Sequence, residues 1–168
     1  DGAGPTVELP VHLKLLEVKK HTTGARVVYH NHASNIIVLT FLLPLKTEII
    51  TRELWETITE CIIVFPQGVG VVPWMNTGGA EAALQTAALA EKQNVILWAH
   101  HGMFCCGKGF DEAFGLAHLM DKAADIWLKI HSAAPGRRQT ITADNFREVV
   151  EQIGLAVDEK YLYEKKEA

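Results

Sequence analysis

The chain has 168 residues, of which 48% are hydrophobic, and a formal net charge of −4. This length and composition are typical of a globular protein whose core buries roughly 70% of the unfolded surface, so we expect one domain over residues 1–168. The lack of a basic stripe argues against nucleic acid as a partner, and the lack of an apolar stretch of about 18 residues argues against a membrane span.

Apolar runs in the first half alternate with breaks, a pattern that predicts both helices and strands. The run Cys-Ile-Ile-Val-Phe at residues 61–65 is short and rich in β-branched residues, which favours a buried strand. In chain order we predict a helix over residues 10–20, a strand ending at His30, a buried helix over residues 33–43, a short helix over residues 51–60, a strand over residues 61–65 and another over residues 69–74.

The second half begins with strong helix formers in an amphipathic order at residues 81–93. A buried strand over residues 94–98 follows and leads to His100, with a loop expected at Gly102. Residues 111–132 form the longest periodic segment and predict a long helix. A last helix is expected from a cap at residues 142–145 to about residue 153, followed by a solvated tail after Asp158.

Histidines gather where two of the predicted strands end. His30 and His32 are two residues apart, so in an extended chain both imidazoles lie on one face. His100 and His101 follow the second strand, and either could supply a third imidazole. Three neutral imidazoles with an open position suit a catalytic zinc better than a structural one. The alternative is that these pairs arise by chance among eight histidines; the other four, which are read as ordinary helix or surface residues, are His12, His21, His118 and His131.

The cysteines favour a reducing compartment. Cys61, Cys105 and Cys106 are odd in number, and the adjacent pair is poorly placed to form a disulfide with itself. No Cys-X-X-Cys spacing marks them as metal ligands. We therefore expect buried or half-buried thiols in a cytoplasmic protein, which also fits the lack of a signal-peptide pattern at the N-terminus.

Two glutamates are candidates for acid/base chemistry. Glu8 lies where a loop becomes a helix, a position at which a carboxylate is electrostatically favoured, although a capping or solvated role is the alternative. Glu60 immediately precedes the apolar run at residues 61–65. Glu53 and Glu56 lie on the same stretch, so composition alone does not single out Glu60.

Several segments in order along the chain resemble the class II aldolases, and most of all those that cleave L-rhamnulose 1-phosphate. The similarity extends from the first residues to the last predicted helix, and it is much more specific than a His-X-His pair. The segments that carry it are Val28-Tyr29-His30-Asn31-His32-Ala33-Ser34-Asn35, Arg52-Glu53-Leu54-Trp55-Glu56 with Thr59-Glu60-Cys61, Val64-Phe65-Pro66 through Gly70, and Leu97-Trp98-Ala99-His100-His101-Gly102.

The resemblance implies a role for each candidate residue. His30, His32 and His101 correspond to the three zinc ligands, and His100 corresponds to an aromatic position of the family. Glu8 corresponds to the catalytic acid/base glutamate. Glu60 matches a glutamate that reaches the active site of a neighbouring subunit. The implied fold is a three-layer α/β/α sandwich with a largely antiparallel central sheet.

An oligomer is also expected. Family members are homotetramers around a four-fold axis, and the resemblance implies the same here. The helix before Glu60 carries Leu54, Trp55 and Ile58 beside charged residues, which is more apolar surface than a lone peripheral helix needs. We therefore expect this helix to contribute to a contact between subunits.

The implied reaction is the zinc-dependent, reversible cleavage of L-rhamnulose 1-phosphate to dihydroxyacetone phosphate and L-lactaldehyde. Two alternatives stay open. One is a related enzyme that acts on L-fuculose 1-phosphate or epimerises a pentulose 5-phosphate. The other is a metal-binding fragment without activity.

The chain departs from the family at its N-terminal end. It begins at Asp1 without an initiator Met, whereas family enzymes carry a long preceding segment that holds most of their phosphate-binding residues. Thr6 is the one candidate phosphate contact that remains, and Val7 stands where a hydroxyl is expected. These departures predict a piece of a longer protein or a processed product, with an incomplete phosphate site. Either the missing segment is a separate or cleaved chain, or this fragment is inactive alone.

Overall fold

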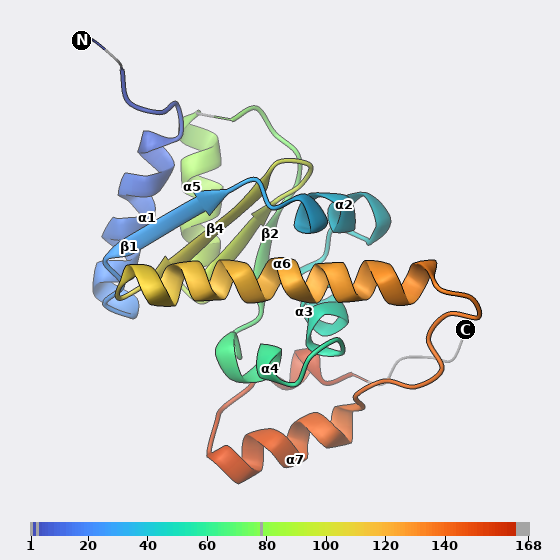
Figure 1. Ribbon diagram of the computed structural model, residues 1–168. Coiled ribbons are helices and arrows are strands. Elements are labelled where there is room, and N and C mark those ends of the chain that lie inside the picture. Colours follow the sequence, from blue (N-terminus) through green and yellow to red (C-terminus); the bar gives the residue numbers. More distant parts are fainter. Residues whose placement is uncertain (1, 3, 78, 164–168) are drawn as a thin grey trace.

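A mixed four-stranded sheet forms the centre of the molecule in the computed structural model, which describes residues 2, 4–77 and 79–163 (Figure 1). The strand order is β1-β4-β3-β2. β4 pairs antiparallel with both β1 and β3, whereas β2 and β3 are parallel, so the sheet is largely antiparallel as predicted. The strands are β1 (Val27–Asn31), β2 (Val69–Val72), β3 (Val95–Trp98) and β4 (Gly102–Gly107).

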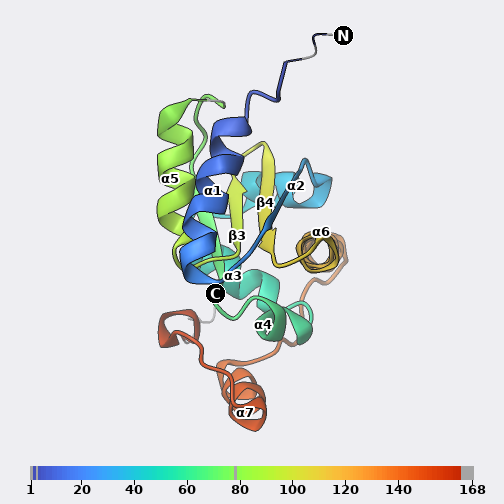
Figure 2. The ribbon, with the colours of Figure 1, turned by 90° about the vertical axis from the view of Figure 1, so that its left-hand side faces the viewer.

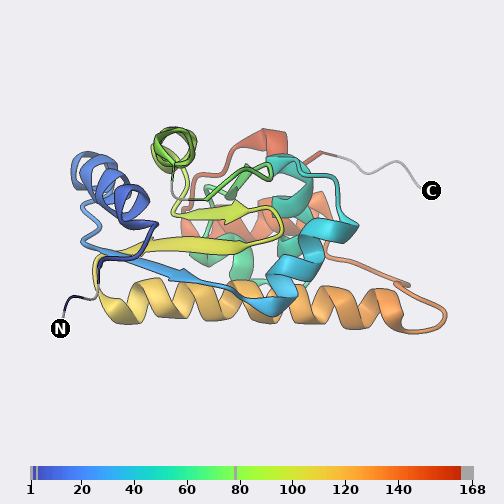
Figure 3. The same cartoon turned by 90° about the horizontal axis from the view of Figure 1, so that it is seen from above.

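Helices cover both faces of this sheet and complete the predicted three-layer α/β/α sandwich (Figures 2 and 3). α1 (Leu9–Thr22) and α5 (Ala80–Ala90) pack together over one face. No helix within the described ranges is both long and apolar enough to cross a membrane. On the other side, the helices that contact the strands are α2 (Ser34–Leu42), α3 (Thr47–Trp55) and α6 (Phe110–Ser132). Two further helices, α4 (Glu60–Val64) and α7 (Ala143–Ile153), lie below the sheet in Figure 1.

The central strands are apolar on both faces because helices cover both. Along β3, Val95 and Leu97 face the core under α6, whereas Ile96 and Trp98 face the core under α1 and α5. All four side chains are nearly or fully buried. This is the continuous apolar pattern of a strand that is covered on both sides, with alternate residues entering different cores.

Two predictions in the middle of the chain were wrong. Residues 61–65 belong mostly to helix α4, because Cys61 and Ile62 are buried while Ile63 and Val64 are partly exposed, a one-sided burial that a short helix provides. A short apolar run does not distinguish a strand from a helix by periodicity. The residues after His101 form β4 rather than a loop. Their sequence, Gly-Met-Phe-Cys-Cys-Gly, lacks the β-branched residues that mark most strands.

Burial also corrects two other expectations. Leu54 and Trp55 are fully buried in their own subunit, so they are not available for the predicted contact between subunits. In the tail after Asp158, residues 164–168 lie outside the described residues. The described part is not simply solvated, because Tyr161 in the short 3-10 helix η1 (Glu159–Tyr161) is buried and its hydroxyl donates to the Gln67 carbonyl at 3.0 Å. The predicted cap of the last helix is confirmed, with the Asn145 amide donating to Thr142 Oγ1 at 3.2 Å.

Candidate metal centre

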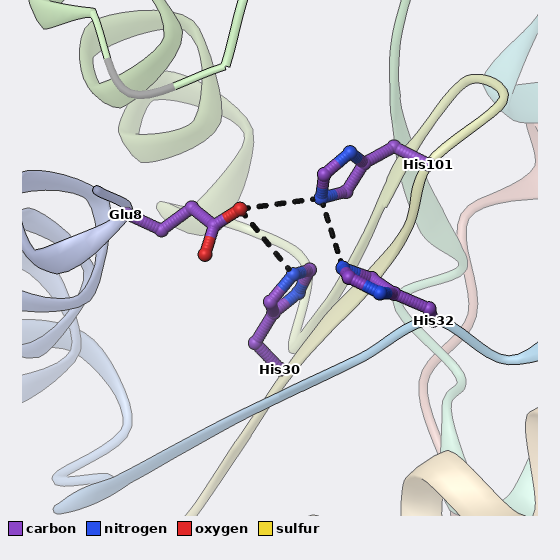
Figure 4. A group of neighbouring side chains, drawn as sticks. All are labelled: Glu8, His30, His32 and His101. Carbon is purple, nitrogen blue, oxygen red and sulfur yellow. Dashed lines mark hydrogen bonds and ion pairs between the residues drawn. The ribbon is translucent and has the colours of Figure 1, made fainter. Parts of the chain in front are cut away.

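Four side chains from separate parts of the chain meet where β1 ends and β4 begins (Figure 4). They are Glu8, His30, His32 and His101, and one possible ligand atom from each lies within 4.8 Å of those from the others. Glu8 immediately precedes α1, and His101 lies in the turn between β3 and β4. His30 lies in the last part of β1, and His32 directly follows the strand. The structure thus brings together the three histidines and the helix-entry glutamate that the sequence singled out.

The strand register accounts for this arrangement. His30 lies opposite Phe104 on β4, and β4 is joined to β3 by the short turn that carries His101. Because alternate residues of a strand share a face, His30 and His32 both point toward that turn. Figure 4 shows the three imidazoles converging, with the Glu8 carboxylate facing them from α1.

The distances within the cluster suit a small metal ion. His32 Nε2 lies 3.2 Å from His101 Nε2, and Glu8 Oε1 lies 3.3 Å from His101 Nε2 and 3.9 Å from His30 Nε2. Ligands arranged tetrahedrally at the usual zinc distances are separated by about 3.3 Å. Two of the three distances are close to this value and the third is longer, so the three imidazoles and the carboxylate lie near enough to hold one divalent metal ion.

His30 provides the strongest test of whether these residues fit a metal. Its Nδ1 lies 2.9 Å from the Met103 carbonyl oxygen, to which it donates a hydrogen bond, so the lone pair is on Nε2. Nε2 is buried and has no hydrogen-bond partner within the described part of the chain. A buried acceptor without a partner is costly, whereas metal coordination would satisfy it. Burial also lowers the pKa of His30, although the Met103 carbonyl and Glu8 favour protonation, and the neutral ring is the form that binds metal.

Glu8 is turned toward the histidines. It occupies the N-cap position of α1, yet its side chain makes no capping hydrogen bond. The Thr6 hydroxyl donates to Glu8 Oε2 at 2.9 Å, which leaves Oε1 facing the imidazoles. Burial alone would raise the pKa of Glu8, but the Thr6 hydrogen bond and the nearby histidines outweigh it and lower the pKa overall. The carboxylate is therefore held ionised beside the candidate metal position.

Glu60 lies apart from this cluster. It is exposed at the first position of α4, the helix that leads into the beginning of β2. β2 runs parallel to β3 toward the metal end, so α4 lies near the opposite end of the sheet (Figure 1). The Glu60 side chain is therefore not placed to act on the metal centre of its own chain.

His100 differs from His101 although the two are adjacent. His100 has a positive φ of 62°, its backbone amide donates to Thr40 Oγ1 at 3.0 Å, and its ring lies 4.0 Å from that of Phe41 between centroids. These contacts hold it against α2 and outside the cluster. Strand spacing could not decide between the two histidines, because the direction of each depends on the turn.

His12 lies closer to the site than the sequence indicated. It is half-buried one helical turn after Glu8, and its ring stands edge-on to those of His30 and Phe104, with centroids 6.3 and 5.5 Å apart. Residues four apart lie on the same side of a helix, so the spacing of His12 from Glu8 could have indicated that His12 lies near the site. The sequence could not indicate that Met103 accepts the hydrogen bond from His30, because the acceptor is a backbone carbonyl, which every residue has.

The cysteines are not part of the cluster. Cys61, Cys105 and Cys106 are free and buried, as predicted. Burial raises the pKa of Cys61 to about 12 and that of Cys106 to about 11, so both remain protonated thiols at neutral pH. They belong to the two cores beside the sheet.

Comparison with known proteins identifies the family. Residues 1–128 match the family described as "Class II Aldolase and Adducin N-terminal domain". The chain is 45% identical over 157 residues to the rhamnulose-1-phosphate aldolase of Mannheimia succiniciproducens, covering 92% of this chain and 57% of that protein. It is 44% identical over 155 residues to that of Escherichia fergusonii, covering 91% of this chain and 56% of the relative. The chain thus spans little more than half the length of these relatives.

Solved structures show the same fold. A sugar-phosphate aldolase from Thermotoga maritima superposes with a TM-score of 0.71 at 29% identity, covering 81% of this chain and 58% of that one. An L-fuculose-1-phosphate aldolase from Thermus thermophilus superposes with a TM-score of 0.61 at 25% identity, covering 82% and 70%. Together with the family match and the cluster of three histidines and a glutamate, these similarities show that the chain belongs to the class II aldolase family.

Proposed function

We propose that this chain carries the zinc ligands and the proton-transfer carboxylate of an aldolase that cleaves L-rhamnulose 1-phosphate to dihydroxyacetone phosphate and L-lactaldehyde. The observation that carries the proposal is the placement of Glu8 Oε1 3.3 Å from His101 Nε2, beside the orphaned Nε2 of His30. The names of the relatives at 44–45% identity support the choice of substrate.

His30, His32 and His101 would hold the metal through their Nε2 atoms. A bound zinc would supply a positive charge that stabilises the negative charge developing on the ketose oxygens as the carbon–carbon bond breaks. Zinc is the metal that best suits three imidazoles with a position left for substrate. The hydrogen bond from His30 to the Met103 carbonyl would keep that ring oriented during the reaction.

Glu8 would move the proton. Cleavage breaks the bond between C3 and C4, leaves its electron pair on the three-carbon phosphate fragment and releases C4 as an aldehyde. In total, one proton passes from the C4 hydroxyl to C3, so a carboxylate that accepts and returns it completes the balance. Thr6 is proposed to contact the substrate phosphate as well, since its hydroxyl already lies next to Glu8.

Glu60 would act on a neighbouring copy in a homotetramer. It lies beside the partly exposed Ile63 and Val64 of α4. Phe41, 66% exposed, and Leu42, 57% exposed, lie on α2 next to the turn that carries the metal ligand. One apolar surface lies at each end of the sheet. In a ring of identical subunits, each subunit contacts its two neighbours through two different surfaces, so this arrangement fits such a ring. Such a contact would bring Glu60 toward the neighbour's metal centre.

The three buried free cysteines suit a reducing compartment, and we place the reaction in the cytoplasm. A phosphorylated ketose is the proposed partner molecule.

The experiment is substrate profiling of the full-length protein loaded with zinc. L-Rhamnulose 1-phosphate, L-fuculose 1-phosphate and a pentulose 5-phosphate are compared at equal concentration, with dihydroxyacetone phosphate detected through its enzymatic reduction by NADH. We expect the highest kcat/KM for L-rhamnulose 1-phosphate. Faster cleavage of the fuculose compound, or epimerisation without dihydroxyacetone phosphate, would assign the chain to a related enzyme. Stoichiometric zinc without turnover of any of the three would favour the metal-binding alternative.

A further inference from the structure

The first two residues of β4 contact the segments that carry all three histidine ligands. Gly102 directly follows His101 and packs against the backbone of Asn31 and His32. Met103, the next residue, accepts the hydrogen bond from His30 Nδ1 at 2.9 Å. Gly102 contacts backbone atoms, and Met103 accepts through its backbone carbonyl. Because backbone atoms cannot rotate away as side chains do, these contacts fix the separation between β1 and the β3–β4 turn.

Gly102 allows an unusually close approach of two backbones. A methyl group at position 102 would overlap the carbonyl oxygen of Asn31, and it would lie 3.1 Å from Cα of His32 and 3.2 Å from the carbonyl carbon of Asn31. None of these atoms is the end of a flexible side chain that could rotate away. An added Cβ must instead push apart the strand that leads to His32 and the turn that carries His101.

We propose that Gly102 is a positioning residue of the metal centre, whose missing side chain sets the distance between His32 and His101. The proposal rests on the zinc site described above. In the present arrangement the Nε2 atoms of the two histidines are 3.2 Å apart, close to the separation of about 3.3 Å that two ligands of one zinc need. Because metal–ligand distances tolerate only about 0.2 Å of error, a wider gap between the two backbones weakens binding.

A second glycine at the other end of β4 provides a matched control. A methyl group at Gly107 would lie 2.6 Å from the backbone nitrogen of Ala113, so it also meets backbone that cannot rotate away. Gly107 pairs with Val27 at the start of β1, five residues from Gly102 and hence about 17 Å from it along the strand. Alanine at position 107 therefore strains the same strand without touching a ligand-bearing segment.

The test compares Gly102→Ala and Gly107→Ala with the unmodified protein. Zinc affinity is measured by competition with a chromophoric chelator, and the free energy of unfolding is measured separately without metal. The absorption spectrum of the cobalt(II)-loaded proteins reports the coordination geometry without requiring activity. We expect Gly102→Ala to lower zinc affinity about 10- to 100-fold and to alter the cobalt spectrum, the scale found for outer partners of metal ligands. Gly107→Ala should lose stability but keep its zinc affinity within about twofold, since its effect is remote from the ligands.

The outcomes separate this proposal from the zinc site itself. If the unmodified protein does not bind one zinc, the site is wrong and this inference falls with it. If the unmodified protein binds zinc and Gly102→Ala binds it equally well, the site stands and the positioning role is overturned. Where Gly102→Ala does not fold in buffer, both variants are measured in a stabilising osmolyte. Failure to fold even there, while Gly107→Ala folds, would make Gly102 a requirement of the fold rather than of the metal centre and would also overturn the proposal.

Discussion

The two ends of the sheet present catalytic candidates in opposite ways. At the end where β1 meets β4, Glu8 and three histidines converge, and a buried histidine nitrogen has an unused lone pair. At the other end, Glu60 is exposed on α4, beside apolar side chains that are partly exposed as well. The first arrangement is a candidate metal site within one chain. The second can serve catalysis only as we propose for it, at the metal centre of a neighbouring subunit.

The largest effect is expected at the metal end. His32→Ala should lower zinc affinity by more than about 100-fold, because loss of a ligand exceeds the 10- to 100-fold effect of losing an outer partner. His100→Ala is the matched control, since its ring lies against Phe41 outside the cluster. Metal analysis after dialysis measures both. Stoichiometric zinc in His32→Ala, or equal loss in His100→Ala, would contradict the assignment of ligands.

Glu8→Gln tests the carboxylate within the same cluster. In the full-length protein we expect kcat to fall by roughly 100-fold or more, the usual scale for a general acid/base, while zinc remains bound by the histidines. Glu17→Gln, on an exposed turn of the same helix, should leave kcat unchanged. Steady-state kinetics with parallel zinc analysis distinguishes the two. Normal turnover by Glu8→Gln would leave Glu8 a structural carboxylate.

Mixing subunits tests the other end of the sheet. Glu8→Gln and Glu60→Gln should each be poorly active alone, yet co-assembled oligomers should regain activity because some sites receive both intact residues. When equal amounts of the two variants mix at random, about a quarter of the sites at most combine an intact Glu8 from one subunit with an intact Glu60 from its neighbour. Native mass spectrometry verifies that mixed oligomers are present. No recovery in such oligomers, or a fully active monomer, would remove Glu60 from the site.

The smallest effect is expected from Thr6. The Thr6 hydroxyl lowers the pKa of Glu8, so Thr6→Val should raise that pKa and move the acid limb of the kcat/KM profile to higher pH. Thr6→Ser keeps the hydroxyl and should keep the profile. If Thr6 also contacts the substrate phosphate, the KM of Thr6→Val should rise for phosphorylated substrates only. The expected rise is about tenfold, the usual contribution of one charge-assisted hydrogen bond to affinity. An unchanged profile and KM in Thr6→Val would exclude both roles.

The sequence identifies the ligands better than what holds them in place. His30 and His32 were expected to face one point because a strand repeats every two residues. The helix-entry position of Glu8 left a capping role open, and the resemblance to the class II aldolases selected it. The choice between His100 and His101 depends on turn geometry, which spacing does not encode. Gly102 and Met103 act through backbone atoms, so residue type gives little sign of their contribution.

The fold shows the same division. The long helix α6 and the capped helix α7 followed from periodicity and capping residues. β4 was missed because Cys105 and Cys106 between two glycines do not resemble a strand until pairing with β1 and β3 buries them. The run at residues 61–65 was misassigned because its apolar residues satisfy either a strand or a short helix. Tertiary packing decided both cases.

The proposed metal site is tested most directly by locating zinc in a crystal of the zinc-loaded protein with anomalous diffraction at the zinc absorption edge. We predict one strong anomalous peak for each chain, about 2.0–2.1 Å from Nε2 of His30, His32 and His101. A peak at other residues, coordination through Nδ1 of His30 in place of its bond to Met103, or no peak in a crystal grown with excess zinc would contradict it.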